Sequence, residues 1–227
     1  MVKEGYWLGL PPVLASVAAL LLHWYWMAVL LLLLGAFVSC FFRDPERNIP
    51  KAAGSVVAPA DGRVVVVTDE LHQGRPGRRV SIFLAVWNVH VNRAPAAGRI
   101  TEVEYRPGRF HAAMRARASV ENEQNVFRLA TDAGEIVFKQ IAGWIARRVV
   151  SWKRAGDSVA CGERIGMIRF GSRMDVWLPE DAEIRVRPGD RVAAGTSILA
   201  HWERLARKMG ASETGVAEHE VAEPAHR

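Results

Sequence analysis

A Gly-Ser pair, Gly171-Ser172, lies between the apolar run "IGMIRF" and the strand-like run "MDVWLP". Such a pair is most often a turn, because glycine adopts a positive φ and serine forms local hydrogen bonds. The same pair can also break its own peptide bond. The Ser172 hydroxyl can attack the Gly171 carbonyl, and the ester oxygen that results can later leave. Glycine before the bond leaves room for that approach.

The segments around this pair have the patterns of β-strands. "SVVAPADGRVVVVTDE" predicts a strand, a turn and a second strand, and "GRITEVEYRPG" alternates apolar and polar residues as a half-buried strand does. "RRVSIFLAVWNVHVNRAP" has strand character up to Pro95, and a hairpin is expected through Asp132-Ala133-Gly134. The run "IAGWIARRVV" fits either a continued sheet or a short helix.

Two stretches repeat one pattern on either side of the Gly-Ser pair. Residues 155–168 and 188–200 both contain Gly-Asp-x-Val-x-x-Gly before an apolar strand, which predicts two similar hairpins. We therefore expect a mainly β fold, a compact two-layered domain of the barrel-sandwich type with few short helices. Carrier domains of that type display a modified lysine on a hairpin. The corresponding region here has Gly171-Ser172 and no such lysine, which argues against a biotinyl or lipoyl carrier.

The N-terminal segment has the composition of a membrane anchor. No Lys, Arg, Asp or Glu occurs from Tyr6 to Phe42. One helix of that length would extend about 55 Å, beyond a bilayer core of about 30 Å. We expect a helical hairpin of two short spans, about 7–22 and 24–42, with both ends on the cytoplasmic side and with Pro11-Pro12 interrupting the first. The alternative is one span at 24–42 after an interfacial segment. A cleaved signal peptide is disfavoured.

These patterns divide the chain into an anchor (1–42), a linker (43–54), a β domain (55–204) and a polar tail (205–227) that begins as a helix. The net charge of +6, next to an anchor, points to anionic lipid headgroups. A nucleic-acid partner is not expected, because no recognised motif is present. Cys40 and Cys161 give no disulfide framework and no metal-ligand spacing, so no metal is expected.

Several segments together resemble one family. "GERIGMIRFGSRMDVWLP" resembles the processing-site segment of phosphatidylserine decarboxylases of the short, bacterial and archaeal type. "VVAPADGRV", "VWNVHVNRAPAAG", "YRPGRF", "ENEQN" and "IAGWIARRVV" resemble that family's other blocks in the same order, across about residues 43–200. The resemblance implies an enzyme that converts phosphatidylserine to phosphatidylethanolamine in phospholipid biosynthesis, at the inner cell membrane with its catalytic domain on the cytoplasmic side.

The resemblance also implies the cofactor and the partners. Autocatalytic cleavage of the Gly171–Ser172 bond would turn Ser172 into a covalent pyruvoyl group, so that pyruvate is the cofactor. This group would form a Schiff base with the lipid amine and accept the electron pair released with CO₂. The large chain, ending at Gly171, and the small chain, starting at residue 172, would stay together as a heterodimer, and a higher homo-oligomer stays open.

The family is thought to use an Asp-His-Ser arrangement for self-cleavage, which here assigns His90 as base and Asp61 as the residue that orients it. Taken alone, Asp61 is a typical turn residue and His90 a typical buried histidine. Long-form enzymes have a second histidine in this block, and here that position holds Arg93. Either His90 serves both self-cleavage and substrate protonation, or another residue such as His111 shares the work. Arg93 is a candidate ligand for the lipid phosphate or carboxylate.

Two rival functions remain open. A pyruvoyl decarboxylase could act on a soluble amino acid, although such a substrate needs no membrane anchor. The chain could also be a membrane-tethered β adaptor without catalysis, in which Gly171-Ser172 is only a turn. An adaptor would stay one chain, whereas either enzyme would be cut in two.

Overall fold

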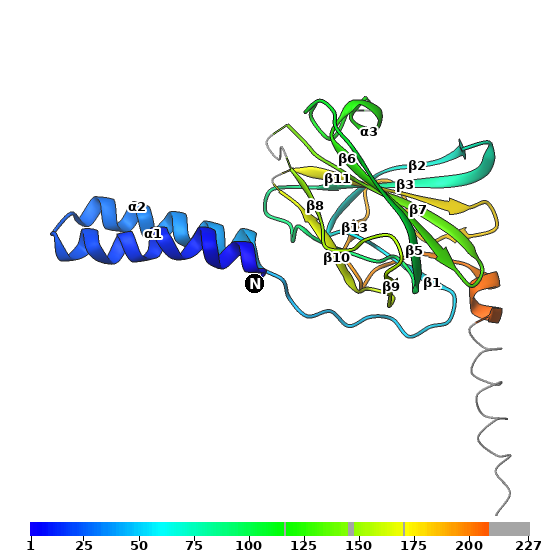
Figure 1. Ribbon diagram of the computed structural model, residues 1–227, viewed down its shortest axis with the longest axis horizontal. Coiled ribbons are helices and arrows are strands. Elements are labelled where there is room, and N and C mark those ends of the chain that lie inside the picture. Colours follow the sequence, from blue (N-terminus) through cyan, green and yellow to red (C-terminus); the bar gives the residue numbers. More distant parts are fainter. Residues whose placement is uncertain (116, 145–147, 170, 209–227) are drawn as a thin grey trace, which may run out of the picture.

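The computed structural model describes residues 1–115, 117–144, 148–169 and 171–208. It consists of an N-terminal pair of helices and a β domain, and the helices project from one side of that domain (Figure 1). The mainly β architecture with few short helices confirms the predicted fold class.

The two N-terminal helices form the expected hairpin. Helix α1 (Lys3–Leu21) and helix α2 (Tyr25–Phe41) pack side by side, and a hydrogen bond from the Val2 N–H to the Phe42 carbonyl closes their base. Among the described residues α1 is long and apolar enough to cross a membrane, and α2 is a shorter apolar helix.

Helix α1 continues through Pro11 and Pro12, so the expected interruption at these residues was wrong. Two prolines remove two backbone donors, but neighbouring helices can support such a segment. Here α2 lies close alongside. A Cβ on Gly35 would lie only 2.5 Å from the Val13 side chain, so this glycine lets the two helix backbones approach closely.

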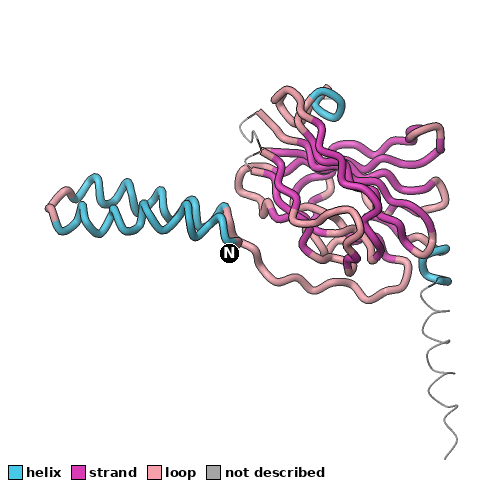
Figure 2. Tube along the Cα trace, in the orientation of Figure 1, coloured by secondary structure: helices cyan, strands magenta, loops and turns pink. Residues whose placement is uncertain are grey.

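The β domain is built on one large curled sheet, which Figure 2 shows in magenta. In spatial order its strands are β13 (Arg191–Val192), β2 (Gly62–His72), β3 (Arg75–Leu84), β11 (Ser172–Pro179), β7 (Gly134–Ile141), β6 (Gln124–Thr131), β5 (Gly98–Arg106) and β9 (Ser158–Val159). The β6–β7 hairpin and the β2 and β5 strands lie where the sequence patterns predicted them.

Two small sheets and a short helix complete the domain. One sheet contains β4 (Val91–Arg93), β10 (Arg164–Ile168) and β8 (Val149–Ser151), and the other contains β1 (Ser55–Val57), β14 (Ile198–His201) and β12 (Glu183–Ile184). Helix α3 (Ala118–Glu121) lies near one end of the large sheet, and residues 203–208 form a short C-terminal helix.

The core lies on the inner face of the curled sheet. Its aromatic centre is the stacked pair Phe127 and Phe138, with ring centroids 4.9 Å apart, and Leu84, Ile136 and Trp202 are buried in the same cluster. The repeated Gly-Asp pattern forms turns as expected. Gly156 and Gly189 have φ values of 99° and 103°, in a region that favours glycine.

Residues 43–54 join the helices to the β domain. They form neither a regular helix nor a strand, and in Figure 2 they are the long loop that runs from the helical hairpin to the far side of the domain. We call this segment the strap. The sequence predicted a linker here, and the contacts of the strap with the β domain bear directly on the candidate site.

Candidate active site

Ser172 is the first residue of the central strand β11. It pairs with Leu84, the last residue of β3, and its side chain is fully buried. Within the described part of the chain, the Ser172 Oγ atom has no hydrogen-bond partner. A buried hydroxyl without a partner is unfavourable, so its presence at the end of a strand indicates a role other than stabilising the fold.

Gly171 precedes this strand and has the conformation expected of a turn, with a φ of +63°. A residue with a side chain is strained in this left-handed region, whereas glycine is not. The Gly171 carbonyl and the Ser172 hydroxyl therefore belong to a point where the backbone turns abruptly into the sheet.

His90 is held next to the same junction by the strand pairs on either side. The Ile168 N–H donates to the His90 carbonyl at 3.2 Å, and Val91 pairs with Met167 between β4 and β10. Ile168 ends β10 of the small sheet, and Ser172 begins β11 of the large sheet four residues later. Leu84 ends β3 of the large sheet, and His90 directly precedes β4 of the small sheet. Because β10 pairs with β4 and β11 pairs with β3, His90 and Ser172 lie at the same end of the domain.

The hydrogen bonding of His90 defines which ring nitrogen is a base. Its Nδ1 atom lies 2.8 Å from the Asn88 carbonyl oxygen, which can only accept, so Nδ1 carries the proton in the neutral ring. The lone pair is then on Nε2, which is buried and has no partner among the described residues. A base in this state can accept a proton without first breaking a hydrogen bond.

Burial keeps the His90 ring neutral. It lowers the pKa of His90 to about 4, although the hydrogen bond with Asn88 acts in the opposite direction, and the charge of Arg43 lowers it further. The Phe41 ring, at the end of α2, covers the imidazole with centroids 4.3 Å apart. At neutral pH His90 is thus a proton acceptor, and the last turn of the helical hairpin helps to desolvate it.

Asn88 positions His90, and sequence reasoning gave it no role. Its own side-chain Oδ1 accepts the Ala85 N–H at 2.8 Å, and its N–H donates to the Ala85 carbonyl at 2.9 Å. Asn88 therefore closes the tight turn after β3 and presents its carbonyl to the imidazole. An asparagine just after a strand and next to a candidate histidine is a signal that could have indicated this.

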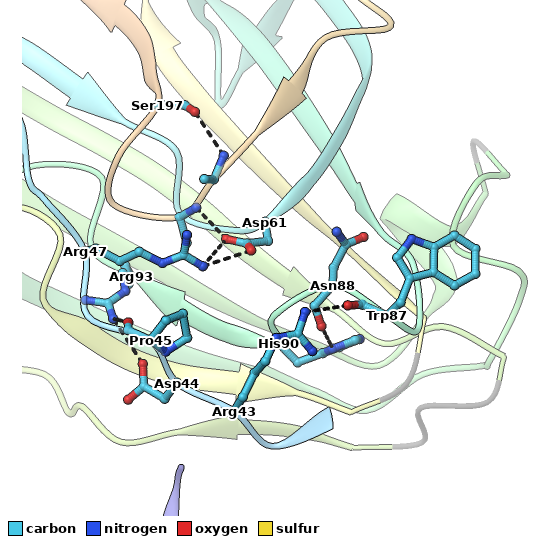
Figure 3. Close-up of polar contacts among 12 residues, drawn as sticks. Arg43, Asp44, Pro45, Arg47, Asp61, Trp87, Asn88, His90, Arg93 and Ser197 are labelled. Atoms are coloured by element: carbon cyan, nitrogen blue, oxygen red, sulfur yellow. Dashed lines mark hydrogen bonds and ion pairs between the residues drawn. The ribbon is translucent and has the colours of Figure 1, made fainter. Parts of the chain in front are cut away.

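Asp61 lies in the same region but does not contact His90. Arg47 donates from one guanidinium nitrogen to both Asp61 carboxylate oxygens at 2.9 Å, and the Ala194 N–H donates to Oδ1 at 2.7 Å. Figure 3 shows this cluster separate from the pair of His90 and Asn88. The expected role of Asp61, to orient His90 directly, has no contact to support it among the described residues.

Arg93 is buried and is occupied by protein groups. It donates to Asp44 Oδ1 at 3.1 Å, to the Pro45 carbonyl at 3.2 Å and to the Gly162 carbonyl at 3.0 Å. Burial lowers the pKa of the Arg93 guanidinium, and the charge of Asp44 opposes that shift. An arginine with these partners is better suited to fasten the strap than to bind a lipid headgroup.

His111 lies apart from the other candidates. Its Nε2 atom is 2.9 Å from Glu121 Oε2, and its N–H donates to Asn122 Oδ1 at 2.8 Å. The side chain is partly exposed. The structure thus brings Ser172 and His90 to one end of the domain, places Asp61 and Arg93 beneath the strap, and leaves His111 near α3.

The strap is therefore fastened to the residues that the sequence singled out. Asp44 binds both Arg93 and Arg164, and Arg47 binds Asp61. The sequence predicted residues 43–54 only as a linker, and these ion pairs join it to two of the candidate site residues, Asp61 and Arg93. Sequence reasoning missed Arg47, although two charges between prolines in "RDPERNIP" are unusual for a free linker.

We expect Arg47→Ala to lower the free energy of unfolding by about 3 kcal/mol, because the largely buried Asp61 carboxylate loses its charged partner. The matched control is Arg207→Ala, whose ion pair with Glu203 is exposed on both sides and should contribute little to stability, because solvent screens it. Both variants are compared in a Ser172→Ala chain, so that every sample is uncut, by denaturant unfolding in detergent. Equal stability of the two variants would contradict a structural role for the strap.

The comparisons with known proteins agree with the geometry. A sequence model of the family described as phosphatidylserine decarboxylase matches residues 34–200. A protein of Solibacter usitatus named phosphatidylserine decarboxylase proenzyme is 54% identical over 182 residues, which cover 80% of this chain and 85% of the relative. A protein of the same name from Symbiobacterium thermophilum is 47% identical over 201 residues, covering 87% and 93%.

A third relative of that name, from Cupriavidus pinatubonensis, is 44% identical over 198 residues, with 84% of this chain and 91% of the relative covered. The family match contains the end of α2, the strap, His90, Gly171 and Ser172. The similarity therefore extends over the helical hairpin's last turns and the whole candidate site, and this chain belongs to the phosphatidylserine decarboxylase family.

Proposed function

We propose that this chain is a self-processing enzyme that decarboxylates phosphatidylserine to phosphatidylethanolamine. The observation that carries the proposal is the buried Ser172 hydroxyl, which follows a turn glycine and has no hydrogen-bond partner among the described residues, in a chain whose relatives are named proenzymes. A hydroxyl that only formed a turn would have a local hydrogen-bond partner.

The first stage is cleavage of the chain by Ser172. Its Oγ attacks the Gly171 carbonyl carbon, the peptide nitrogen takes the proton and leaves, and an ester joins Gly171 to the Ser172 side chain. A base then removes the α-proton of residue 172, and the Gly171 carboxylate leaves from Cβ. The dehydroalanine that remains reacts with water and releases ammonia, so residue 172 becomes a pyruvoyl group.

His90 is the base best placed for the second of these steps. Its ring is neutral at physiological pH, with a pKa of about 4, and its free lone pair is on Nε2. No His90–Ser172 hydrogen bond forms in the uncut chain, but catalytic hydrogen bonds are often long until the reacting groups are in place. Asp61 binds Arg47 and the loop at Ala194 rather than His90, so we assign it a role in holding the strap.

Residue 172 suits the cofactor that the family implies. A pyruvoyl group supplies a ketone that holds the substrate amine and takes up the electron pair left by CO₂. Its formation removes a hydroxyl that has no partner within the described chain, so no hydrogen bond is lost. Full burial of residue 172 beside Leu84 excludes bulk water, and neutral His90 can accept or return a proton nearby.

The two chains would remain one domain after cleavage. The small chain contributes β11, which lies between β3 and β7 of the large chain. A buried polar network also crosses between them. Arg173 donates to Asp175 Oδ1 at 2.6 Å and to Ser81 Oγ at 2.8 Å, and Ser119 donates to Asp175 Oδ2 at 2.5 Å. Arg173 follows the new chain end directly, so the network fixes the cofactor's neighbour.

The helical hairpin would hold the enzyme in the inner membrane. At 19 and 17 residues, α1 and α2 extend about 28 and 26 Å, close to a bilayer core of about 30 Å. Trp24 and Trp26 lie at the turn and are exposed, as interfacial residues are. Lys3 and Arg43 lie at the other end with the β domain, which favours the cytoplasmic side for it.

The surface around the scissile bond supports a membrane substrate. Trp87, Met114 and Trp144 are exposed by 77%, 67% and 70%. Trp87 follows the strand that pairs with Ser172, and Trp144 follows Gly143, which touches the Gly171 carbonyl. Arg43, at the end of the hairpin, donates to the Trp87 carbonyl at 2.6 Å. Exposed apolar side chains on the hairpin's side of the domain suit contact with lipid.

The test is the mass of the purified protein and its activity on lipid vesicles. The whole chain weighs 25.1 kDa for 227 residues, so cleavage at residue 171 gives chains of about 19 and about 6 kDa. We expect a small chain that lacks a free α-amine and that releases CO₂ from phosphatidylserine. One uncut band would favour the adaptor. A cut protein that decarboxylates free serine as well as the lipid would favour a soluble substrate.

A further inference from the structure

A second glycine, Gly143, lies directly against the bond that is cut. A Cβ built on Gly143 would be 1.8 Å from the Gly171 carbonyl oxygen and 2.9 Å from its carbon. Side-chain carbons essentially never come within 3.0 Å of such an atom. Gly143 does not need a positive φ, so its lack of a side chain serves close approach to Gly171 rather than a special backbone conformation.

A buried polar clamp holds Gly143 in this place. Asn122 Nδ2 donates to the Ala142 carbonyl at 2.7 Å and to the His111 carbonyl at 2.8 Å, and the Ala142 N–H donates to the Glu123 carbonyl at 2.9 Å. Farther along, Glu123 Oε1 accepts the Val149 N–H at 3.2 Å. Both Asn122 and Glu123 are buried.

These contacts explain why the polar residues Asn122 and Glu123 are buried. Asn122 uses its side-chain oxygen for the His111 N–H and both amide hydrogens for carbonyls, so it is fully bonded, as a buried amide must be. Asn122 binds the Ala142 carbonyl and the Glu123 carbonyl accepts the Ala142 N–H. Both bonds hold the residue directly before Gly143, and so keep Gly143 against Gly171.

We propose that Gly143, held by Asn122 and Glu123, is a positioning residue for self-cleavage that sets the direction of the Gly171 carbonyl during attack by Ser172. This inference rests on the proposed function. The Gly171 carbonyl oxygen packs against the Gly143 backbone. The peptide plane between Gly171 and Ser172 therefore cannot rotate freely. The face presented to the Ser172 hydroxyl is thereby fixed before reaction, and only the first step, formation of the ester, depends on it.

The test uses Gly143→Ala and separates the ester step from the elimination step. A methyl group must push the Gly171 carbonyl by about 1 Å, and a misplacement of that size can cost about 10²-fold in rate. Purified uncut chain is followed on denaturing gels with and without hydroxylamine, which cleaves an ester but not the peptide bond. We expect cleavage of Gly143→Ala about 10²-fold slower than wild type, and no acceleration by hydroxylamine, because no ester forms.

Gly77→Ala is the matched control. Its Cβ would meet the Leu178 carbonyl oxygen at 2.6 Å, on the same two strands as the site, but Gly77 pairs with Pro179 rather than with Ser172. Seven residues of strand separate the two pairs, about 23 Å. Gly77→Ala should therefore destabilise the sheet and still cut at the wild-type rate.

Three results would overturn the inference: wild-type cleavage in Gly143→Ala, rapid cleavage of that variant by hydroxylamine, or equal slowing in Gly77→Ala. If Gly143→Ala does not fold, as judged by near-ultraviolet circular dichroism, Asn122→Ala decides instead. It frees Ala142 without adding a methyl group, and a folded Asn122→Ala chain that cuts at the wild-type rate would also overturn it. An uncut wild-type chain would instead refute the proposed function itself.

Discussion

Replacing Ser172 by alanine is expected to leave a single uncut chain of 25.1 kDa with no measurable decarboxylation. Alanine has no oxygen to attack the Gly171 carbonyl and no group that can leave from Cβ, so both stages of the proposed cleavage fail. The fold should survive, because the Ser172 Oγ forms no hydrogen bond within the described chain. We even expect a small gain in stability, since a buried unpartnered hydroxyl costs about 1–3 kcal/mol.

The measurement is a denaturing gel and intact mass, together with CO₂ release from phosphatidylserine vesicles. Ser55→Ala is the matched control, because Ser55 is also buried at the start of a strand but pairs with His201 on a small sheet. It should cut and act as the wild type does. Ser172→Cys and Ser172→Thr retain a β heteroatom and should cut slowly. An active, cleaved Ser172→Ala protein would refute the mechanism.

Much of the fold could be predicted because its signals are local. The alternating residues of β5, the Gly-containing turn between β6 and β7 and the repeated Gly-Asp turns depend on neighbours a few residues apart. The Gly-Ser pair alone is typical of a turn, and Ser172 became a candidate only through the resemblance of several segments, taken together, to one family. Register, strand order and the curl of the sheet depend on residues far apart in the chain, and no sequence period encodes them.

The partners of the site residues could not be predicted for the same reason. Arg47 and Asp61 are 14 residues apart, and Arg93 and Gly162 are 69 apart. Nothing in either local sequence indicates that the partner of Asp61 is Arg47 of the strap and not His90. Gly143 was equally hidden, because the role that we propose for it depends on its contact with Gly171, which is distant in the sequence. A family pattern can name residues, but their contacts come from the three-dimensional structure.

His90→Ala is expected to slow self-cleavage by about 10²- to 10⁴-fold, the usual contribution of a general base. The ester between Gly171 and Ser172 should still form, because Gly143 and not His90 sets that step. Hydroxylamine should therefore cut His90→Ala rapidly and leave an unmodified Ser172 at the new chain end. This result is the reverse of the one expected for Gly143→Ala, so the two variants identify the steps in which each residue acts.

The pH dependence of the wild type tests the same assignment. His90 acts as a base only when neutral, and burial lowers its pKa to about 4. The cleavage rate should therefore stay constant as pH falls from 8 to about 5 and should decline only near pH 4. A histidine with an ordinary pKa near 6.5 would already be half protonated at pH 6.5, and the cleavage rate would have fallen by half there. A midpoint near 6.5 would assign the base to a more exposed group.

His72→Ala is the control that separates chemistry from packing. His72 also packs against an aromatic ring, Trp177, at a centroid distance of 5.0 Å, and its Nε2 is likewise buried without a partner among the described residues. It lies at the opposite end of β2 and β3 from Leu84. If loss of a stacked imidazole only loosened the fold, both variants would cut equally slowly. Because His72 lies at the far end of the strands from Ser172, we expect His72→Ala to cut at the wild-type rate. Rapid cleavage in His90→Ala would leave His90 a purely structural part of the core.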